Sequence, residues 1–317
     1  MPIRIPDTLP ATGILESENI FVMTEYRAIH QDIRPLRVLI LNLMPTKVET
    51  ETLILRKLSN SPLQVDIEFL RTDSNAEATQ MEHLRDFYVT LGEIRNKHYD
   101  GMIVTGSPVE TNSFEETSFW PELCEIFDWA KTHVFSTFYI SWSAQAGIYY
   151  HFRVKNKPLE FPLYGVFPNK VVKPSSPLVR GVNDLVWSPR AQKAVIDVAD
   201  IDAHAELEPV IVGDEAGVYV AKSTDSRHFF VFGHPEYESD TFLLKYQREL
   251  EANGSAQLPR NYFPDNDPAK KPLATWRSDG QLIYTNWLNY YVYQATPYDI
   301  DSLSMGFPSA GTGRFLF

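Results

Sequence analysis

Apolar residues in the first half of the chain gather in short continuous runs, separated by segments in which they recur with helical spacing. Continuous runs of this length predict strands that are buried on both faces, as in a parallel sheet. The predicted strands are residues 36–44, 65–70, 101–104 and 134–140, and the predicted helices between them are residues 49–58, 84–94 and 119–131. Strands that alternate with helices indicate an α/β fold with a doubly wound, mainly parallel sheet.

The pattern changes in the second half, where the apolar segments are shorter and turns separate them. We expect strands of more antiparallel character at residues 163–172, 210–212 and 218–221, followed by a strand at residues 229–233. Helices are predicted at residues 241–252 and 281–294, with a Pro-rich loop between them. The last helix is rich in aromatic residues, and we expect it to pack on the sheet or in a subunit contact rather than bind a cofactor.

Length and composition suggest how the chain is divided. Its 317 residues fit one α/β domain with extensions. We assign this domain to residues 36–300 and expect residues 1–35 to be an N-terminal extension that packs on the domain or joins a subunit contact. Residues 301–317 contain Gly, Ser and Pro, and we expect them to form a flexible tail after the C-terminal helical segment.

Charge and cysteine content narrow the class of protein. A net charge of −12 without a basic cluster argues against nucleic-acid binding. The one cysteine, Cys124, cannot form an internal disulfide and lies in an amphipathic pattern, so we expect a packed thiol in a reducing compartment. No signal peptide or membrane span is visible, which makes the cytoplasm the expected location and a membrane partner unexpected.

No resident cofactor is predicted from the sequence. The histidines are scattered and do not have the spacing of a metal site, so we expect no metal. The glycines form neither a P-loop nor a dinucleotide-binding fingerprint. These absences direct attention to chemistry performed by the side chains themselves.

The predicted strand at residues 134–140 ends abruptly at a small hydroxyl residue, Ser141, and passes into a segment of helical character. This is the pattern of a nucleophile on a strand-to-helix turn, where the side chain projects above the sheet. An ordinary βα turn with a structural serine is the alternative interpretation. A serine hydroxyl needs an adjacent base before it can act as a nucleophile, so another part of the chain has to supply that base.

His234 is the candidate base, because it directly follows the predicted strand at residues 229–233. Glu236 lies two residues further on and is suited to orient the imidazole, although a buried structural histidine is the alternative. Lys47 and residues 107–110 also follow predicted strands. Ligands of open α/β sheets bind beyond the carboxyl ends of the strands, so these residues together predict one site.

Longer segments match one known family in the same order along the chain. Among them are Met1-Pro-Ile-Arg-Ile-Pro, Leu41-Asn-Leu-Met-Pro, Ala144-Gln-Ala-Gly, Gly233-His-Pro-Glu-Tyr, Asn261-Tyr-Phe-Pro and Asn286-Trp-Leu-Asn-Tyr-Tyr-Val-Tyr-Gln. The chain resembles the homoserine O-acyltransferases of methionine biosynthesis, the type with a class I glutamine amidotransferase-like (flavodoxin-like) fold. The resemblance runs from residue 1 to about residue 300 and implies an amino-acid acceptor, an acyl-CoA co-substrate and a homodimer.

The resemblance also assigns residues to the site, with one change at its centre. The family pattern His-Ile-Cys-Trp-Gly-Ala-Gln-Ala is here Tyr139-Ile-Ser-Trp-Ser-Ala-Gln-Ala, so the cysteine that carries the acyl group is replaced by Ser141. His234 and Glu236 match the family base and its partner. We expect the main-chain N–H of Trp142, and those of the loop near residues 46–47, to bind the oxyanion.

The resemblance also assigns Arg248, Lys47 and Glu110 to substrate binding. Arg248 matches the arginine that is implied to hold the amino-acid substrate, and Lys47 matches a family lysine near the site. Val109 and Glu110 match the pattern of acetyl-using members, whereas succinyl-using members have glycine. A carboxylate at Glu110 would repel the carboxylate of a succinyl group, so the resemblance favours acetyl-CoA.

Other family positions are altered. The family lysine before Leu-Phe-Gly-Val-Phe falls near Pro162, the substrate-contacting serine of Pro-His-Ser-Arg-His-Thr-Glu is Ala191, and the next arginine is Gln192. Three hypotheses follow. The chain is an acyl-CoA-dependent O-acyltransferase that acts on homoserine or a related amino acid through an acyl-Ser141 intermediate; it has moved to another acceptor or acyl donor; or it is a non-catalytic relative that binds a ligand.

Overall fold

The computed structural model describes residues 4–5, 23–24, 35–74, 81–109 and 113–301. Most of the predicted N-terminal extension and nearly all of the predicted tail lie outside these residues, so both assignments stay predictions. Within the extension, two short strands, β1 (Arg4–Ile5) and β2 (Met23–Thr24), pair in parallel.

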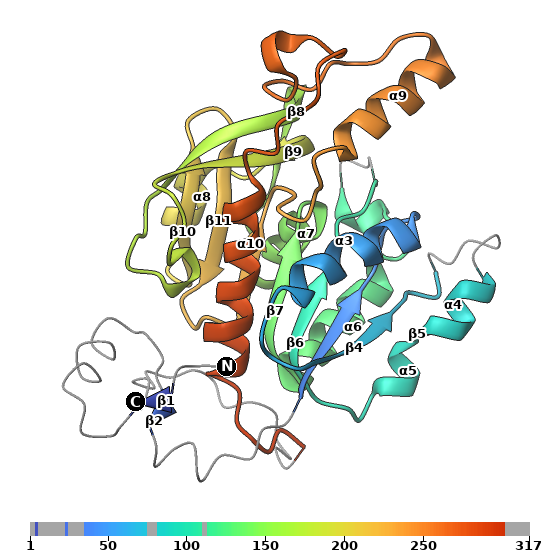
Figure 1. Ribbon diagram of the computed structural model, residues 1–317. Helices are drawn as coiled ribbons and strands as arrows, with labels where there is room; N and C mark the ends of the chain where they lie inside the picture. Colours follow the sequence, from blue (N-terminus) through green and yellow to red (C-terminus); the bar gives the residue numbers. More distant parts are fainter. Residues whose placement is uncertain (1–3, 6–22, 25–34, 75–80, 110–112, 302–317) are drawn as a thin grey trace.

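The centre of the molecule is a ten-stranded sheet with the strand order β5-β4-β3-β6-β7-β12-β11-β10-β8-β9 (Figure 1). Its strands are β3 (Leu36–Leu41), β4 (Val65–Leu70), β5 (Tyr88–Val89), β6 (Tyr99–Val104), β7 (Val134–Ile140), β8 (Lys157–Val171), β9 (Leu185–Val195), β10 (Leu207–Gly213), β11 (Gly217–Ser223) and β12 (His228–Val231). The pairs from β5 to β12 are parallel. The pairs from β12 to β9 are antiparallel. The predicted change of strand character in the second half is confirmed.

Helices connect the strands and cover both faces of the sheet. They are α3 (Lys47–Ser59), α4 (Met81–Phe87), α5 (Leu91–Ile94), α6 (Trp120–His133), α7 (Trp142–Phe152), α8 (Val198–Asp202), α9 (Thr241–Asn253) and α10 (Arg277–Asn286), with short 3₁₀ turns at Phe114–Glu116, Pro177–Val179 and Pro264–Asn266. The last segment, η5 (Trp287–Tyr293), continues α10 as a π-helix. Among the described residues, no helix combines the length and apolarity needed to cross a membrane.

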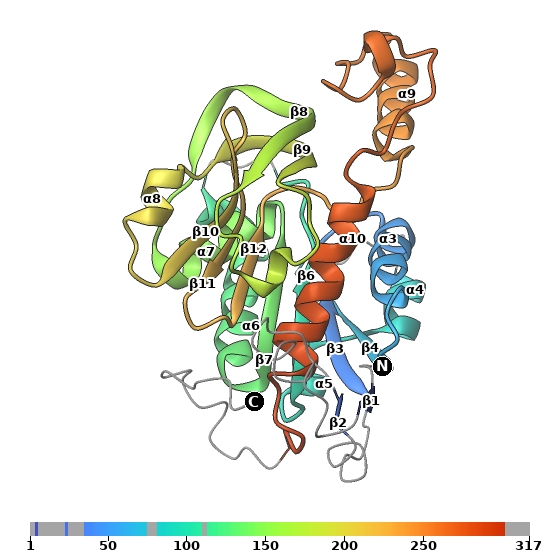
Figure 2. The ribbon, with the colours of Figure 1, turned by 60° about the vertical axis from the view of Figure 1, so that its left-hand side comes forward.

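Two apolar layers hold the helices against the sheet. On one face, side chains of α6 and α7 pack with residues such as Leu39, Val104 and Tyr139. On the other, α3 and α10 pack on residues such as Ile40 and Phe138 (Figure 2). The aromatic helix is part of this second layer, where Trp287 is fully buried and donates its indole N–H to Ser136 at 2.9 Å. Packing on the sheet, one of the two expected roles of this helix, is therefore confirmed, and so is the doubly wound α/β fold.

The predicted helix at residues 84–94 is wrong, because this segment divides into α4, the short strand β5 and α5. Tyr88 pairs with Phe69 at the edge of the sheet and donates its hydroxyl to Glu51 at 2.5 Å. Thr90 and Glu93 then form a reciprocal capping box that starts a new helix. The pairing of β5 with β4 and the cap at Thr90 therefore divide a segment that the apolar spacing predicted to be one helix.

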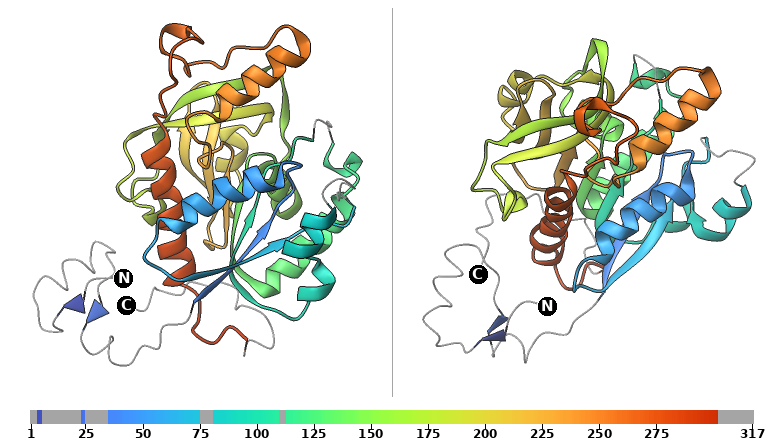
Figure 3. Two further views of the ribbon diagram at one scale, coloured as in Figure 1. Left: turned by 45° about the vertical axis from the view of Figure 1, so that its right-hand side comes forward. Right: turned by 45° about the horizontal axis from the view of Figure 1, so that its top comes forward.

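Strand β9 was not predicted, and neither were the two-residue strands β1, β2 and β5. Strand β9 pairs along most of its length with β8, and the two form a long hairpin beyond the carboxyl ends of the parallel strands (Figure 3). Helix α9 lies at the same end of the molecule (Figure 3). The hairpin and this helix supply most of the walls of the site described next.

Candidate active site

Ser141 occupies a strained turn between β7 and α7. Its backbone angles, φ 56° and ψ −115°, are rare for a residue with a side chain, and such a conformation costs on the order of 1–3 kcal/mol. Its main-chain N–H donates a hydrogen bond to the Val231 carbonyl at 2.7 Å, which ties the turn to the neighbouring strand. The strand-to-helix turn predicted from the sequence is therefore present, with the hydroxyl-bearing residue at its apex.

Ser143 supports this turn from inside the protein. Its side chain is fully buried, and its hydroxyl accepts a hydrogen bond from the Ile140 N–H at 3.0 Å. The same hydroxyl donates to the Val104 carbonyl on strand β6 at 2.8 Å. The residue that replaces a family glycine thus links the last residue of β7, the turn and the adjacent strand.

The turn brings Ser141 and His234 to the same place at the end of the sheet. A Cβ atom placed on Gly106 would lie 3.4 Å from the Ser141 Cβ and 3.6 Å from the His234 Cε1, so both side chains border this glycine. Among the described residues, no hydrogen bond joins the Ser141 hydroxyl to the imidazole. Such contacts are commonly long before substrate binds, so the spacing is compatible with a nucleophile and its base.

Glu236 holds the imidazole of His234 in one orientation. Glu236 Oε1 lies 2.7 Å from His234 Nδ1, and both residues are buried. The Tyr237 ring stacks on the imidazole with a centroid distance of 4.2 Å. Since a carboxylate accepts hydrogen bonds, Nδ1 is the protonated nitrogen of the neutral ring, which leaves Nε2 as the base.

The predicted oxyanion-binding groups differ in their availability. Trp142 is the first residue of α7, and no described residue accepts a hydrogen bond from its N–H. First-turn N–H groups of a helix are unpaired within the helix and suit a negative charge. The Lys47 N–H, in contrast, donates to the Pro45 carbonyl at 3.0 Å. The oxyanion role expected of the loop near residues 46–47 stays a prediction.

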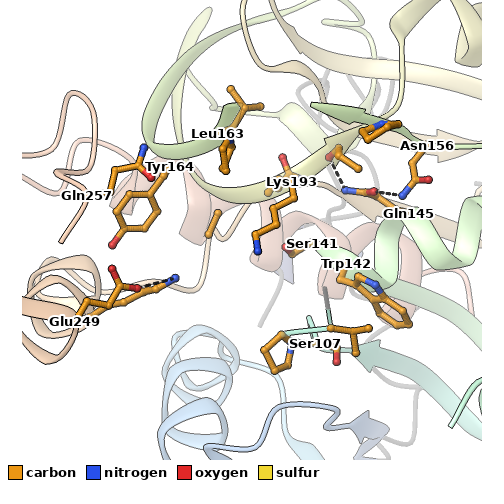
Figure 4. A pocket seen from close by; sticks show the side chains of 18 residues that line it. Ser107, Ser141, Trp142, Gln145, Asn156, Leu163, Tyr164, Lys193, Glu249 and Gln257 are labelled. Atoms are coloured by element: carbon orange, nitrogen blue, oxygen red, sulfur yellow. Dashed lines mark hydrogen bonds and ion pairs between the residues drawn. The ribbon is translucent and has the colours of Figure 1, made fainter. Parts of the chain in front are cut away.

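Ser141 and Trp142 open onto a cavity of about 470 Å³. Its walls come from the loop after β6, the start of α7, the β8–β9 hairpin, α9 and the loop that follows α9 (Figure 4). Side chains of Gln145 and Asn156 form one end, where Asn156 donates its amide N–H to Gln145 at 2.8 Å. A cavity of this size beside a candidate nucleophile can hold a small substrate.

Two of the substrate-binding residues assigned by resemblance, Arg248 and Lys47, are not among the residues that line this cavity. The Arg248 side chain is 59% exposed and lies 3.6 Å from Glu49, outside the lining. Lys47 is buried and donates its ammonium group to the Asn42 carbonyl at 2.8 Å, also outside the lining. Glu110 lies outside the described residues, while its neighbour Val109 lines the cavity. The roles assigned to Arg248 and Lys47 by the resemblance therefore stay predictions.

Other polar residues line the cavity, and none of them was predicted from the sequence. Tyr164 and Lys193 come from the β8–β9 hairpin, and Lys245 and Glu249 come from α9. In Figure 4 the Lys193 side chain points into the cavity on the side of Ser141. These positions were missed because β9 was not predicted and because the apolar pattern does not tell which side of α9 faces the cavity.

Cys124 is not part of the site. It lies on α6, half-buried, and burial raises the pKa of its thiol. A raised pKa lowers the thiolate fraction and with it the reactivity. The expectation of a packed, unreactive thiol agrees with this placement.

Comparisons with known proteins agree with the resemblance. The family model described as homoserine O-succinyltransferase matches residues 2–298. A homoserine O-acetyltransferase of Acetivibrio thermocellus is 46% identical over 96% of this chain and 100% of its own length. The homoserine O-acetyltransferase of Methanomethylophilus alvi is 48% identical over 96% and 98%. The homoserine O-succinyltransferase of Shewanella piezotolerans is 46% identical over 96% and 97%.

The fold also has a counterpart among solved structures. A glutamine amidotransferase of Thermotoga maritima superposes with a TM-score of 0.51 and 12% sequence identity, covering 81% of this chain and 98% of the other. This likeness confirms the expected class I glutamine amidotransferase-like fold. The family model and the curated relatives cover nearly the whole chain, and the chain therefore belongs to the family of homoserine O-acyltransferases.

Proposed function

We propose that this acyltransferase moves an acetyl group from acetyl-CoA to the hydroxyl of homoserine through an acyl-Ser141 intermediate. The observation that carries the proposal is the strained turn that holds Ser141 at the cavity wall, next to the buried His234–Glu236 pair. Strained backbone at a turn of this kind is typical of nucleophiles. The names of the relatives supply the acceptor and the class of reaction.

In the first half-reaction, His234 Nε2 takes the proton of the Ser141 hydroxyl as the oxygen attacks the thioester carbonyl of the acyl-CoA. The tetrahedral intermediate places its oxyanion near the Trp142 N–H. When the intermediate collapses, the carbon–sulfur bond breaks and the CoA thiolate leaves with the proton from His234. An oxygen ester on Ser141 remains.

In the second half-reaction, His234 takes the proton of the homoserine hydroxyl, and the resulting oxygen attacks the Ser141 ester. Collapse of this intermediate forms the O-acyl homoserine and returns the proton to Ser141. Glu236 keeps Nδ1 protonated in both steps and stabilises the imidazolium that forms. General-base assistance of this type contributes about 10²–10⁴-fold to the rate.

The choice of acetyl rests on Val109 and Glu110. The curated relatives include both acetyl and succinyl enzymes at similar identity, so overall similarity does not distinguish them. Val109 lines the cavity, and Glu110 is the next residue along the chain. By the resemblance, a carboxylate at position 110 disfavours a donor that carries a second carboxylate.

A direct test is the intact mass of the purified protein after incubation with acetyl-CoA, and separately with succinyl-CoA, without acceptor. A mass gain of one acetyl group that maps to Ser141 is expected. Labelling by succinyl-CoA alone would contradict the acetyl assignment. No labelling and no release of free CoA with either donor would contradict the acyl-serine mechanism and support a non-catalytic ligand-binding role.

A second candidate function is transfer to a different acceptor or from a different acyl donor. The observation that favours it is the presence of Ala191 and Gln192 in the cavity lining, at positions where the resembling family has a serine and an arginine. Acyl-Ser141 that forms from acetyl-CoA, persists with homoserine and is discharged by another hydroxy amino acid would support this alternative.

We also propose that the protein acts in the cytoplasm as a homodimer. The single cysteine fits a reducing compartment, and the dimer is an expectation from the resemblance. Light scattering after size-exclusion chromatography measures the oligomeric state directly, and a monomeric mass would contradict the second part of this proposal.

A further inference from the structure

The carboxylate of Glu236 is held through only one of its two oxygens. Its Oε1 lies 2.7 Å from His234 Nδ1, whereas its Oε2 is buried and has no hydrogen-bond partner among the described residues. A buried carboxylate oxygen without a partner is costly, so the groups around it need to be identified. Two helices far away in the sequence, α3 and α10, supply them.

Helix α10 packs directly against the segment that carries His234 and Glu236. A Cβ atom placed on Gly280 would lie 2.8 Å from the Pro235 carbonyl oxygen, so the missing side chain of Gly280 allows this close approach. Tyr284 follows one turn later on the same face of α10, and helical side chains lean toward the N-terminal end of their helix. The Tyr284 side chain therefore leans toward Pro235 and Glu236.

Tyr284 has a hydroxyl that suits the free oxygen of Glu236. The residue is buried, and its hydroxyl has no hydrogen-bond partner in the part of the chain that the structure describes. Burial raises the pKa of Tyr284, and the negative charge of Glu236 raises it further. Because the hydroxyl stays protonated, it is a donor, and Glu236 Oε2 is an acceptor. One water molecule between the two groups would partner both atoms.

Lys57 brings a positive charge to the same place from helix α3. Its side chain is 3% exposed, and its Nζ lies 4.0 Å from Glu238 Oε1. Burial lowers the pKa of the ammonium group, while the carboxylates of Glu238 and Glu236 oppose this shift. Helices α3 and α10 lie side by side here, since Gln281 donates its amide N–H to the Lys57 carbonyl at 2.8 Å (Figure 2). A lysine is rarely buried to this degree unless it pairs with a negative charge.

The other charges around Lys57 are Arg56 and Arg277, which lower the pKa of its ammonium group. Arg277 lies 3.9 Å from Glu238 Oε2, so Glu238 is shared between Arg277 and Lys57. The Glu236 carboxylate, in contrast, has no ion pair with a lysine or arginine among the described residues. Lys57 is thus left to oppose the charge of Glu236.

The titratable groups that face Glu236 are His234 and three buried tyrosines, Tyr219 on β11, Tyr237 beside the imidazole and Tyr284 on α10. Burial raises the pKa of all three tyrosines, so they stay neutral near neutral pH. The proton on the imidazole is therefore the one whose binding depends on the balance between the Glu236 and Lys57 charges.

We propose that Lys57 and Tyr284 are positioning residues that hold Glu236 ionised and in place behind His234. This inference rests on the proposed function, in which Glu236 orients the base. The Lys57 charge offsets part of the Glu236 charge, so His234 binds a proton less readily and stays available as a base at lower pH. The Tyr284 hydroxyl engages Oε2 and leaves Oε1 to the imidazole.

The first test is the pH dependence of kcat/KM for acetyl-CoA, which reports on the free enzyme. Lys57→Met keeps the length of the side chain and removes the ammonium group. The midpoint on the acid side of the profile is expected to move up by about 0.5 pH unit or more, because the imidazole is protonated more readily without the Lys57 charge. Lys57→Arg keeps the charge and should restore the midpoint. Lys57→Gln is a second neutral variant and should give the same shift if Lys57→Met does not fold.

Lys222→Met is the matched control for Lys57→Met. Lys222 is also buried beside a glutamate, 3.5 Å from Glu208, but it pairs with Phe229 near the start of β12, whereas His234 follows the end of that strand. An equal loss at every pH in Lys57→Met, with an unchanged midpoint, would show a purely structural role and overturn the proposal. A midpoint that moves as far in Lys57→Arg or in Lys222→Met would also overturn it.

The Tyr284 assignment has its own test. Tyr284→Phe removes the hydroxyl and keeps the ring, and kcat is expected to fall about threefold to tenfold with KM for acetyl-CoA unchanged, the effect of one lost hydrogen bond. Tyr291→Phe is the matched control, because Tyr291 is buried further along the same helical segment and its hydroxyl contacts Ser176 at 3.4 Å. An unchanged kcat in Tyr284→Phe, or the same fall in both variants, would overturn the role of Tyr284.

A measurement without turnover separates this inference from the proposed function. NMR titration of the imidazole nitrogens in the Ser141→Ala protein, with the His234 signals assigned by comparison with His234→Gln, follows protonation of His234 directly. Addition of Lys57→Met is expected to raise the titration midpoint by about 0.5 pH unit or more. A raised midpoint in a protein that never forms an acyl-serine would support the effect of Lys57 and contradict only the proposed function. An unchanged midpoint would overturn the inference, even for an active acyltransferase.

Discussion

The hydroxyl of Ser143 lies 2.8 Å from the carbonyl oxygen of Val104 and connects the turn after β7 to strand β6. It also accepts a hydrogen bond from the Ile140 N–H at 3.0 Å, so one side chain contacts both β6 and β7 beside Ser141. The serine that replaces a family glycine at this position therefore strengthens the turn and does not disrupt it. The strained geometry of Ser141 is held by this contact and by its own N–H bond to Val231.

Replacing Ser143 is expected to destabilise the protein. Ser143→Ala removes a buried hydroxyl from two hydrogen bonds and should lower the free energy of unfolding by about 1–3 kcal/mol. Urea denaturation measures this change. Ser59→Ala is the control, because the exposed Ser59 hydroxyl donates to the Arg56 carbonyl within its own helix and to no other described residue. Its loss should cost less than about 0.5 kcal/mol. Equal effects of the two changes would contradict the supporting role of Ser143.

Replacing Ser141 tests its proposed role as the nucleophile. Ser141→Ala should abolish acylation by acyl-CoA, because no atom remains to form the ester. Ser141→Cys should preserve or raise acylation, since a thiol is partly ionised near neutral pH and is the stronger nucleophile. Intact-mass analysis after incubation with acetyl-CoA measures both outcomes, and full turnover by the alanine variant would exclude the acyl-serine mechanism.

Replacing the base and its partner should give different results. His234→Ala removes the proton acceptor and is expected to lower kcat by about 10²–10⁴-fold. Glu236→Gln keeps the volume but can place the imidazole proton on the wrong nitrogen, so kcat should fall and the pH dependence should change.

Glu238→Gln is the matched control for Glu236. Glu238 lies two residues further along and contacts Lys57 at 4.0 Å and Arg277 at 3.9 Å rather than the imidazole. Steady-state kinetics across pH compare the variants. The orienting role of Glu236 would be refuted by a Glu238→Gln enzyme that is as impaired as Glu236→Gln.

Acid is expected to destabilise the protein through histidines beneath the turn. The Tyr139 hydroxyl contacts His151 at 3.0 Å and His228 at 3.2 Å. Burial lowers the pKa of His228 from its ordinary 6.5 to about 4, against the attraction of Asp225, and lowers the pKa of His151 in the same direction. The folded state therefore binds fewer protons than the unfolded state between about pH 6.5 and pH 4.

Stability contributed by these neutral histidines is present above pH 6.5 and is lost as the pH falls toward 4. As the pH falls through this window, each histidine that stays neutral in the folded state lowers the free energy of unfolding by about 1.4 kcal/mol per pH unit. Urea denaturation at pH values from about 7.5 down to about 4.5 measures how the free energy of unfolding changes with pH. This range spans most of the interval in which the histidines would titrate. His228→Asn should give a shallower dependence, and an unchanged slope would show that other groups cause the acid sensitivity.

Several features of this protein followed from the sequence because they depend on neighbouring residues. The apolar run that ends at Ser141 is by itself enough to predict a strand followed by a turn. The end of β7 and the start of α7 were therefore located correctly. His234 and Glu236 are two residues apart after a strand, and the short spacing keeps them together in any fold that forms this strand. The alternation of strands and helices likewise fixed the parallel sheet, since buried strands need apolar residues on both faces.

Features that depend on distant pairing were decided only by the tertiary structure. Strand β9 has no clear apolar alternation, and its pairing with β8 brings Lys193 and Tyr164 to one wall. The orientation of α9 turns Lys245 toward the cavity and leaves Arg248 beside Glu49. Residue identity and spacing along the chain therefore identified the candidate nucleophile, the candidate base and the parallel sheet. Which polar side chains surround them was set by hairpin register and helix orientation, because these depend on packing between segments far apart in the sequence.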